Sequence, residues 1–222
     1  MRRISVLILA VLVGGTALCS AQQQNKWEVY GGFSIQRASG YPNLYNPGST
    51  LDEFLGFTMK GGEASVSYFP WAHVGFTGDF AIVSKSQSVI APQDTQTVHE
   101  QQYLFGPTYR YTFKGSPRLT VFAHQLFGVG HTSVVFTPSN FYCSFTPSGV
   151  GSTTCTANPF TMVSGGGVDV RVTSHISIRP AQMDYWAQQI SEQTFFGSGS
   201  VNDSSKFGVS GFRYSAGGVL NF

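Results

Sequence analysis

Two cysteines, Cys143 and Cys155, have the chemistry that is easiest to define from residue type and spacing. They enclose eleven residues of a polar segment that is predicted to be a surface loop. In an oxidising compartment such a pair forms a disulfide, and closing a loop of this size restricts the unfolded chain by roughly 3 kcal/mol. No histidine or further cysteine has a spacing nearby that suits a metal site. We therefore predict a disulfide between these two cysteines and no bound metal.

The tripeptide His131-Thr132-Ser133 is a second pattern with chemical potential, because residues two positions apart share one face of a strand. A serine hydrolase acting on lipid needs such a pair together with a carboxylate that orients the histidine. The sequence offers no acid placed for that role, so no enzyme and no catalytic residue is predicted; a lipid-modifying enzyme is kept as an alternative. The glycines at 165–167 lack the lysine and helix of a phosphate-binding loop, and no cofactor is predicted.

Charged residues form the third group. They fall on the polar faces of segments in which apolar and polar residues alternate: Glu28, Glu63, Asp79, Arg110, Asp169, Arg171 and Arg213, with Arg179 and Asp184 added on either side of Pro180. If the segments form a narrow barrel, these side chains fill its interior, where charges must be paired and hydrogen-bonded. We predict a salt-bridged plug. The alternative is a gate that opens when Arg110 or Arg213 loses its acidic partner.

The elements that must position these residues are strands, because the apolar positions recur with a period of two. Eight are predicted, at residues 26–37, 57–69, 73–83, 99–113, 119–133, 160–172, 176–187 and 206–222. Long polar connections at 38–56, 84–98, 134–159 and 188–205 alternate with short turns at 70–72, 114–118 and 173–175. Pro107 predicts a bulge or local irregularity, and Pro180 a break in its strand. Strict alternation of long and short connections fits eight antiparallel strands with both termini at one end.

The final segment shows the clearest alternation. Its even-numbered positions form an apolar face that ends in a terminal phenylalanine: Phe212, Tyr214, Ala216, Gly218, Leu220 and Phe222. An exposed edge strand of this kind favours aggregation, and pairing with the first strand removes the edge. A last strand with Tyr214, Ala216, Gly218, Leu220 and Phe222 on one face resembles the small eight-stranded bacterial outer-membrane barrels of the OmpA-like and OmpX-like type.

The resemblance implies an all-β fold: an eight-stranded antiparallel transmembrane β-barrel, up-and-down, with short periplasmic turns and four long extracellular loops. It also implies that the five residues named for it are read as a signal by the barrel-assembly machinery. The expected surroundings are outer-membrane lipid and lipopolysaccharide, and the expected role is structural, with surface interaction through an extracellular ligand of the loops. A narrow, gated, porin-like pore is the alternative.

The start of the chain predicts export. Arg2 and Arg3, an apolar run at residues 4–13 and small residues up to Ala21 are typical of a cleaved signal peptide, residues 1–21. Residues 22–222 then form one barrel domain in the outer membrane of a Gram-negative-type envelope. Loss of the two arginines lowers the formal net charge from +2 to 0, which indicates no nucleic-acid partner. Only 11% of residues are charged, which suits a lipid-facing sheet or, alternatively, a secreted β-sandwich.

Overall fold

The computed structural model describes residues 26–39, 57–88, 95–116, 118–137, 153–191 and 206–222. These residues form nine strands: β1 (Trp27–Ser39), β2 (Phe57–Tyr68), β3 (Val74–Ser88), β4 (Thr95–Thr112), β5 (Leu119–Thr137), β6 (Thr153–Ala157), β7 (Phe160–Arg171), β8 (Ile176–Ser191) and β9 (Lys206–Asn221). Among them, no helix is long and apolar enough to cross a membrane.

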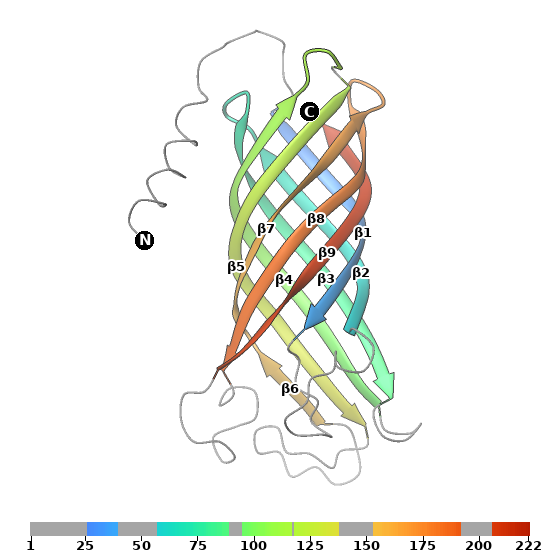
Figure 1. Ribbon diagram of the computed structural model, residues 1–222, viewed down its shortest axis with the longest axis vertical. Helices are drawn as coiled ribbons and strands as arrows, with labels where there is room; N and C mark the ends of the chain where they lie inside the picture. The colour runs from blue at the N-terminus through green and yellow to red at the C-terminus, as the bar shows by residue number, and fades with distance from the viewer. Residues whose placement is uncertain (1–25, 40–56, 89–94, 117, 138–152, 192–205) are drawn as a thin grey trace, which may run out of the picture.

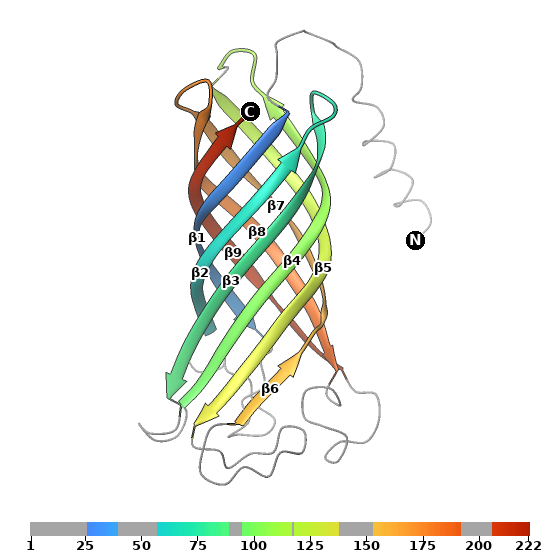
Figure 2. The ribbon, with the colours of Figure 1, turned by 180° about the vertical axis from the view of Figure 1, so that it is seen from behind.

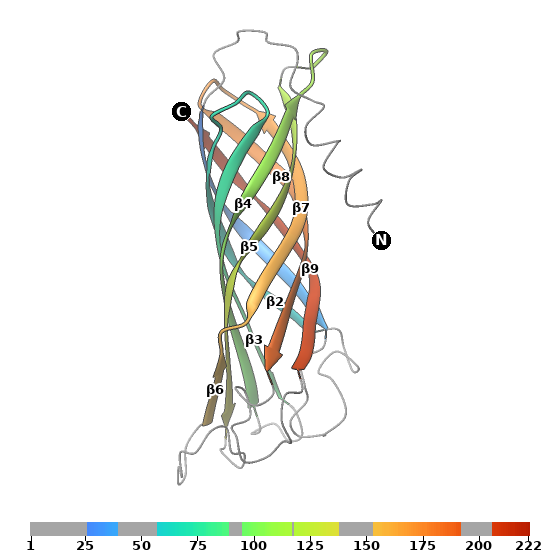
Figure 3. The ribbon, with the colours of Figure 1, turned by 90° about the vertical axis from the view of Figure 1, so that its left-hand side faces the viewer.

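All strand pairs are antiparallel, and the sheet closes on itself. Each strand from β1 to β5 pairs with the next one, β5 pairs with β7, and β8 and β9 continue the series back to β1. The closing seam runs from Glu28 opposite Asn221 to Ser39 opposite Ser210. Figures 1 and 2 show the tilted strands from two sides, and Figure 3 shows the narrow tube from a third. The predicted eight-stranded up-and-down barrel is confirmed.

β6 and β7 together make the sixth stave of this barrel. Both pair with β5, β6 through Thr132 opposite Ala157 and β7 through Val129 opposite Phe160, and the two registers are the same. Between them Gly130 donates a backbone hydrogen bond to the carbonyl of Pro159 at 2.9 Å. The prediction that residues 134–159 form a loop was therefore wrong at its end. Pro159 lacks an N–H, but the strand continues through it.

Other strands also extend further than predicted. β3 and β4 stay paired as far as Ser88 opposite Thr95, so the predicted loop at 84–98 was too long. Pro180 does not break β8; a register shift between Arg179 and Gln182 places it in a bulge, where its carbonyl accepts a hydrogen bond from the Tyr214 hydroxyl at 2.8 Å. Pro107 causes no register shift against β3, where it lies opposite Phe76, but the ladder between β4 and β5 has no pair at Gly106 and Pro107, which is a local irregularity as predicted.

The two faces of the sheet are chemically opposite. Outward positions carry large apolar and aromatic side chains that remain exposed, and several of these rings contact each other across strands, as Phe80 does with Tyr103 at 5.0 Å between centroids. Inward positions are polar in the half near the short turns. In the half near the long connections they include an apolar cluster around Trp186, Leu126 and Met59. An apolar exterior over a polar interior is the pattern of membrane barrels.

Inward glycines are required where neighbouring backbones approach closely. A Cβ on Gly211, in the closing seam, would overlap the carbonyl oxygen of Arg37, whereas a Cβ on Gly218 of the same strand would meet nothing within 4 Å. We predict that Gly211→Ala destabilises the folded barrel by roughly 1–3 kcal/mol because the seam cannot yield without losing backbone hydrogen bonds.

Gly218→Ala is the matched control and is expected to be neutral. The measurement is equilibrium unfolding in urea from lipid vesicles, followed by tryptophan fluorescence. Equal midpoints for the two variants would contradict this account of the seam.

Candidate functional site

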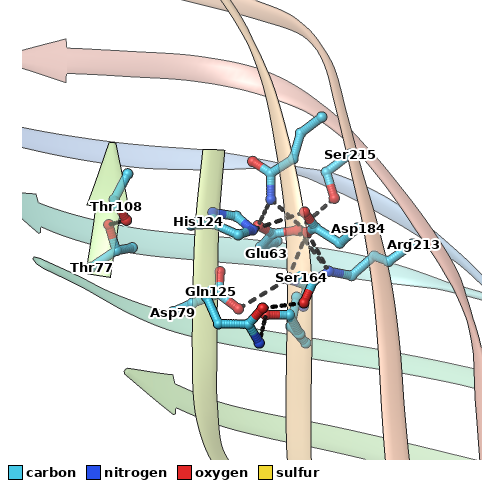
Figure 4. Close-up of polar contacts among 12 residues, drawn as sticks. Glu63, Thr77, Asp79, Thr108, His124, Gln125, Ser164, Asp184, Arg213 and Ser215 are labelled. Carbon is cyan, nitrogen blue, oxygen red and sulfur yellow. Dashed lines mark hydrogen bonds and ion pairs between the residues drawn. The ribbon is translucent and has the colours of Figure 1, made fainter. Parts of the chain in front are cut away.

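The described residues concentrate their charged side chains in a network inside the barrel. Figure 4 shows Glu63 of β2, Asp79 of β3, His124 of β5, Asp184 of β8 and Arg213 of β9 converging there. Each of these residues is at an inward-facing position of its strand, because every strand turns its polar face toward the interior of the barrel. Strands distant in the sequence therefore meet through their side chains as well as through their backbones.

Arg213 is the centre of the network and is completely buried. Its guanidinium lies 3.0 Å from Asp184 Oδ2, 3.2 Å from Asp79 Oδ1 and 3.4 Å from Glu63 Oε2. It also donates to Gln102 Oε1 at 3.1 Å. One cation thus neutralises part of the charge of three carboxylates, and the remaining carboxylate oxygens depend on further donors.

Those donors are neutral side chains and a histidine. Gln182 Nε2 donates to Glu63 at 2.7 Å and to Asp184 at 2.8 Å, and Ser215 Oγ donates to Glu63 at 2.5 Å. His124 Nε2 lies 2.9 Å from Asp184 Oδ1. Glu63 and Asp184 therefore have several partners each, as burial of a charge requires, and Asp79 accepts its hydrogen bond from Arg213.

A second set of ion pairs continues toward the short turns. Arg179 makes a bidentate pair with Asp169, at 2.7 and 3.0 Å, and donates to Gln182 at 2.9 Å, which links it to the Arg213 network. Its guanidinium also stacks on Tyr30 and Phe122, 4.4 and 4.0 Å from their ring centroids. The planar guanidinium of Arg179 thus makes a bidentate ion pair and stacks on two rings at once, which a lysine side chain could not do.

Arg110 and Glu28 form a pair nearest the short-turn end. The Arg110 guanidinium lies over the Phe69 ring, 3.7 Å from its centroid. Two cavities beside these groups have volumes of only ≈ 10 and ≈ 20 Å³. Each is about the size of one water molecule. These two cavities can therefore each hold about one water molecule beside the ion pairs.

The structure places eight of the nine predicted interior charges inside the barrel, and Arg171 differs. Arg171 is exposed, at the end of β7, and lines the small cavity nearest the short turns. Arg171 is the last residue of β7, at the open end of the barrel. Its position faces inward, but the side chain there reaches solvent. Glu100 was missed although it is completely buried. It has the same phase as Arg110 on β4 and lies inside the strand predicted at 99–113, so the predicted alternation already places it on the polar face.

The remaining predicted residues lie elsewhere. Tyr214, Leu220 and Phe222 point outward on or just after β9, beside β1, and Phe222 exchanges backbone hydrogen bonds with Trp27 at 2.9 and 3.2 Å. Ala216 and Gly218 lie between them on the same face. Cys155 is buried in β6, but Cys143 lies outside the described residues, so their disulfide stays a prediction. The described residues contain no group of three or more His, Cys, Asp or Glu side chains that could hold a metal.

Solved structures share this fold. Ail, the attachment invasion locus protein of Yersinia pestis, superposes with a TM-score of 0.54 at 12% identity, covering 90% of this chain and 100% of that one. Ail in complex with the heparin analogue sucrose octasulfate gives 0.52 at 15% identity with the same coverage. Neisserial surface protein A gives 0.53 at 12%, again with 90% and 100% covered. No protein-family model and no curated protein matches the sequence. The chain therefore has the fold of small eight-stranded outer-membrane barrels.

The network predicts a large cost for removing its cation. Arg213→Leu leaves Glu63, Asp79 and Asp184 buried without their shared partner, and we expect a loss of about 3–5 kcal/mol in unfolding free energy at neutral pH. The cost should shrink in acid, because protonated carboxyls no longer need the cation.

The matched control is Arg171→Leu, which removes an exposed arginine from the short-turn end of the barrel. It is expected to lower the unfolding free energy by less than about 1 kcal/mol. Urea unfolding at pH 7 and pH 4 measures both. Similar losses for the two arginines at pH 7 would show that the network does not carry the stability assigned to it.

Proposed function

We propose that this chain is an outer-membrane barrel that acts as a sealed structural anchor and presents its four long connections at the cell surface. The exposed apolar exterior supports placement in a bilayer, since such a surface is unfavourable in water. The signal peptide predicted at residues 1–21 would deliver the chain to the envelope. Barrel-assembly machinery, outer-membrane lipid and lipopolysaccharide are its proposed partners.

The single observation that carries the sealed state is the buried network around Arg213. Opening a water path would separate a guanidinium from three carboxylates within 3.4 Å of it, together with their neutral donors. Because the links run across six strands, moving one side chain leaves other charges unpaired. This favours a static plug over the gated pore.

Surface interaction is proposed for the end of the barrel where the long connections join. The segments 40–56, 89–94, 138–152 and 192–205 contain no lysine or arginine and five carboxylates: Asp52, Glu53, Asp94, Glu192 and Asp203. Binding of a sulfated ligand such as the heparin analogue bound by Ail would need cations there. Four cations, Arg37, Lys60, Lys85 and Lys206, flank these segments on the strands. We therefore propose a neutral or cationic partner for the segments themselves.

Electrical recording tests the seal. In planar bilayers at neutral pH the purified barrel is expected to give no discrete conductance steps, with a reconstituted general porin as the positive control. The paired variant Asp169→Ala with Arg179→Ala removes two packed charges without leaving either unpaired, and is expected to admit small leaks. Discrete steps from the unmodified protein would overturn the plug and favour the pore.

Heparin chromatography in detergent tests the charge of the exposed end. The protein is expected in the unbound fraction at low salt. A variant with Asp52, Glu53 and Asp94 replaced by lysine is the control that should be retained. Retention of the unmodified protein, reversed by salt, would contradict the proposed partner class.

A further inference from the structure

A group of polar side chains lies on the outer face of the barrel at the level where the apolar surface ends. Three rows run across β4, β5 and the β6–β7 stave. The row nearer the short turns is Tyr103, Val129 and Phe160, the middle row is Gln101, His131 and Asn158, and the row beyond is His99, Ser133 and Thr156. Each row follows directly from the strand register.

His131 and Asn158 are joined by a hydrogen bond. The register of β5 with β6 and β7 makes them direct cross-strand neighbours, and His131 Nδ1 lies 2.7 Å from Asn158 Oδ1. An amide oxygen accepts, so Nδ1 carries the proton and Nε2 is left with its lone pair. This is the tautomer that a general base requires, held by a neighbouring side chain.

Ser133 follows His131 by two positions on the same strand and the same face. Their Cα atoms are therefore about 6.5–7 Å apart, a distance that an imidazole ring and a hydroxyl can bridge. Both side chains are partly buried rather than freely exposed. A nucleophile, a base and a group that orients the base thus occupy adjacent positions.

The surroundings select the substrate class. On the short-turn side, Tyr103, Val129 and Phe160 are 53%, 48% and 63% exposed, as expected for side chains that contact acyl chains. On the other side, His99 and Thr156 are polar, and Gln101 supplies an amide in the middle row, its Oε1 accepting from the Tyr103 hydroxyl at 3.0 Å. A molecule with an acyl tail and a polar head would place the bond between them at the level of His131 and Ser133.

We propose that Ser133, His131 and Asn158 form a hydrolytic site for carboxylic esters of outer-leaflet lipids, in addition to the structural role. Ser133 is the nucleophile, His131 the general base and acid, and Asn158 a positioning residue. An asparagine serves in place of a carboxylate in Cys-His-Asn proteases. The sequence prediction found no acid for His131 and placed Asn158 in a loop, which hid the third member.

The reaction balances without a cofactor. Ser133 Oγ attacks the ester carbonyl carbon while His131 Nε2 takes the hydroxyl proton. The tetrahedral intermediate loses the lipid alcohol as the carbon–oxygen bond breaks, and His131 returns the proton to that oxygen. Water, deprotonated by His131, then attacks the acyl-serine. The products are a fatty acid, the lipid alcohol and regenerated Ser133.

The first experiment combines covalent labelling and turnover in the folded, detergent-solubilised protein. A long-chain alkyl fluorophosphonate should label Ser133, located by mass spectrometry of the peptide, with loss of fluoride. A p-nitrophenyl ester with a long acyl chain should be hydrolysed faster than the acetate ester. Vesicles of diacyl phospholipid and, in a separate arm, purified lipopolysaccharide distinguish the two sources of the acyl ester.

Ser133→Ala is expected to remove labelling and to lower turnover by about 10³-fold. Ser210→Ala is the matched control, an outward serine on β9 whose strand neighbours are Ser39 and Ala187 rather than a histidine. It should leave both readouts unchanged. Heat-dependent gel mobility verifies that each variant is folded.

The test of Asn158 needs a measurement that would stay unchanged if this residue only supported the structure. Asn158→Ala is expected to lower kcat by roughly 10²- to 10⁴-fold with little change in KM. Asn158→Asp should retain activity, and its acid limb should move to higher pH because a carboxylate stabilises the protonated imidazole.

The proposal is overturned if the folded protein shows neither labelling at Ser133 nor hydrolysis of either lipid above the Ser133→Ala background. It is equally overturned if hydrolysis survives in Ser133→Ala. Neither result bears on the sealed interior, whose residues face the opposite side of the sheet, so failure of this site and failure of the plug are separately visible.

Discussion

The pairing of β1 with β9 is the constraint on which the rest of the structure depends. Without it both strands would be unpaired edges, and in lipid each unpaired backbone group would cost several kcal/mol. The seam continues past the end of β9, because Trp27 of β1 and Phe222 exchange backbone hydrogen bonds. Its close approach explains an inward glycine at 211, and its outward side carries the aromatic residues that end the chain.

Closure determines what the interior must do. Eight tilted strands enclose a space that side chains can fill, and the inward phase of each strand brings its polar residues into that space. The interior is therefore polar around Arg213 and the exterior carries aromatic rings. This is the reverse of the arrangement in a soluble protein. The same phase rule acts on the outer face, where the outward positions of β5 change from apolar at Val129 to polar at His131 and Ser133.

Alternation alone was sufficient to predict the barrel, the two faces and most of the interior charges. It failed where a single residue type was given too much weight. The loop predicted at 134–159 ended on Pro159, and Pro180 was predicted to break its strand, but one lost N–H is tolerated where the proline's own carbonyl still accepts a hydrogen bond, as it does at both positions. The sequence also could not predict which charges pair with each other. Arg213 and Asp79 are 134 positions apart in the chain and meet only because the sheet closes. The contact between His131 and Asn158 was missed for a different reason: residues 153–158 were predicted to lie in a loop, so their pairing with β5 was not foreseen.

The most direct test of the account is the gel mobility of the membrane fraction, with and without heating in detergent. A closed barrel stays folded in cold detergent, so we predict a faster band that shifts on boiling. Deletion of residues 220–222 should abolish the shift, because it removes two residues of the proposed assembly signal, Leu220 and Phe222, together with the last pairs of the seam. A protein that runs identically before and after heating, or that fractionates without membranes, would contradict the closed, lipid-facing barrel and with it the rest of the account.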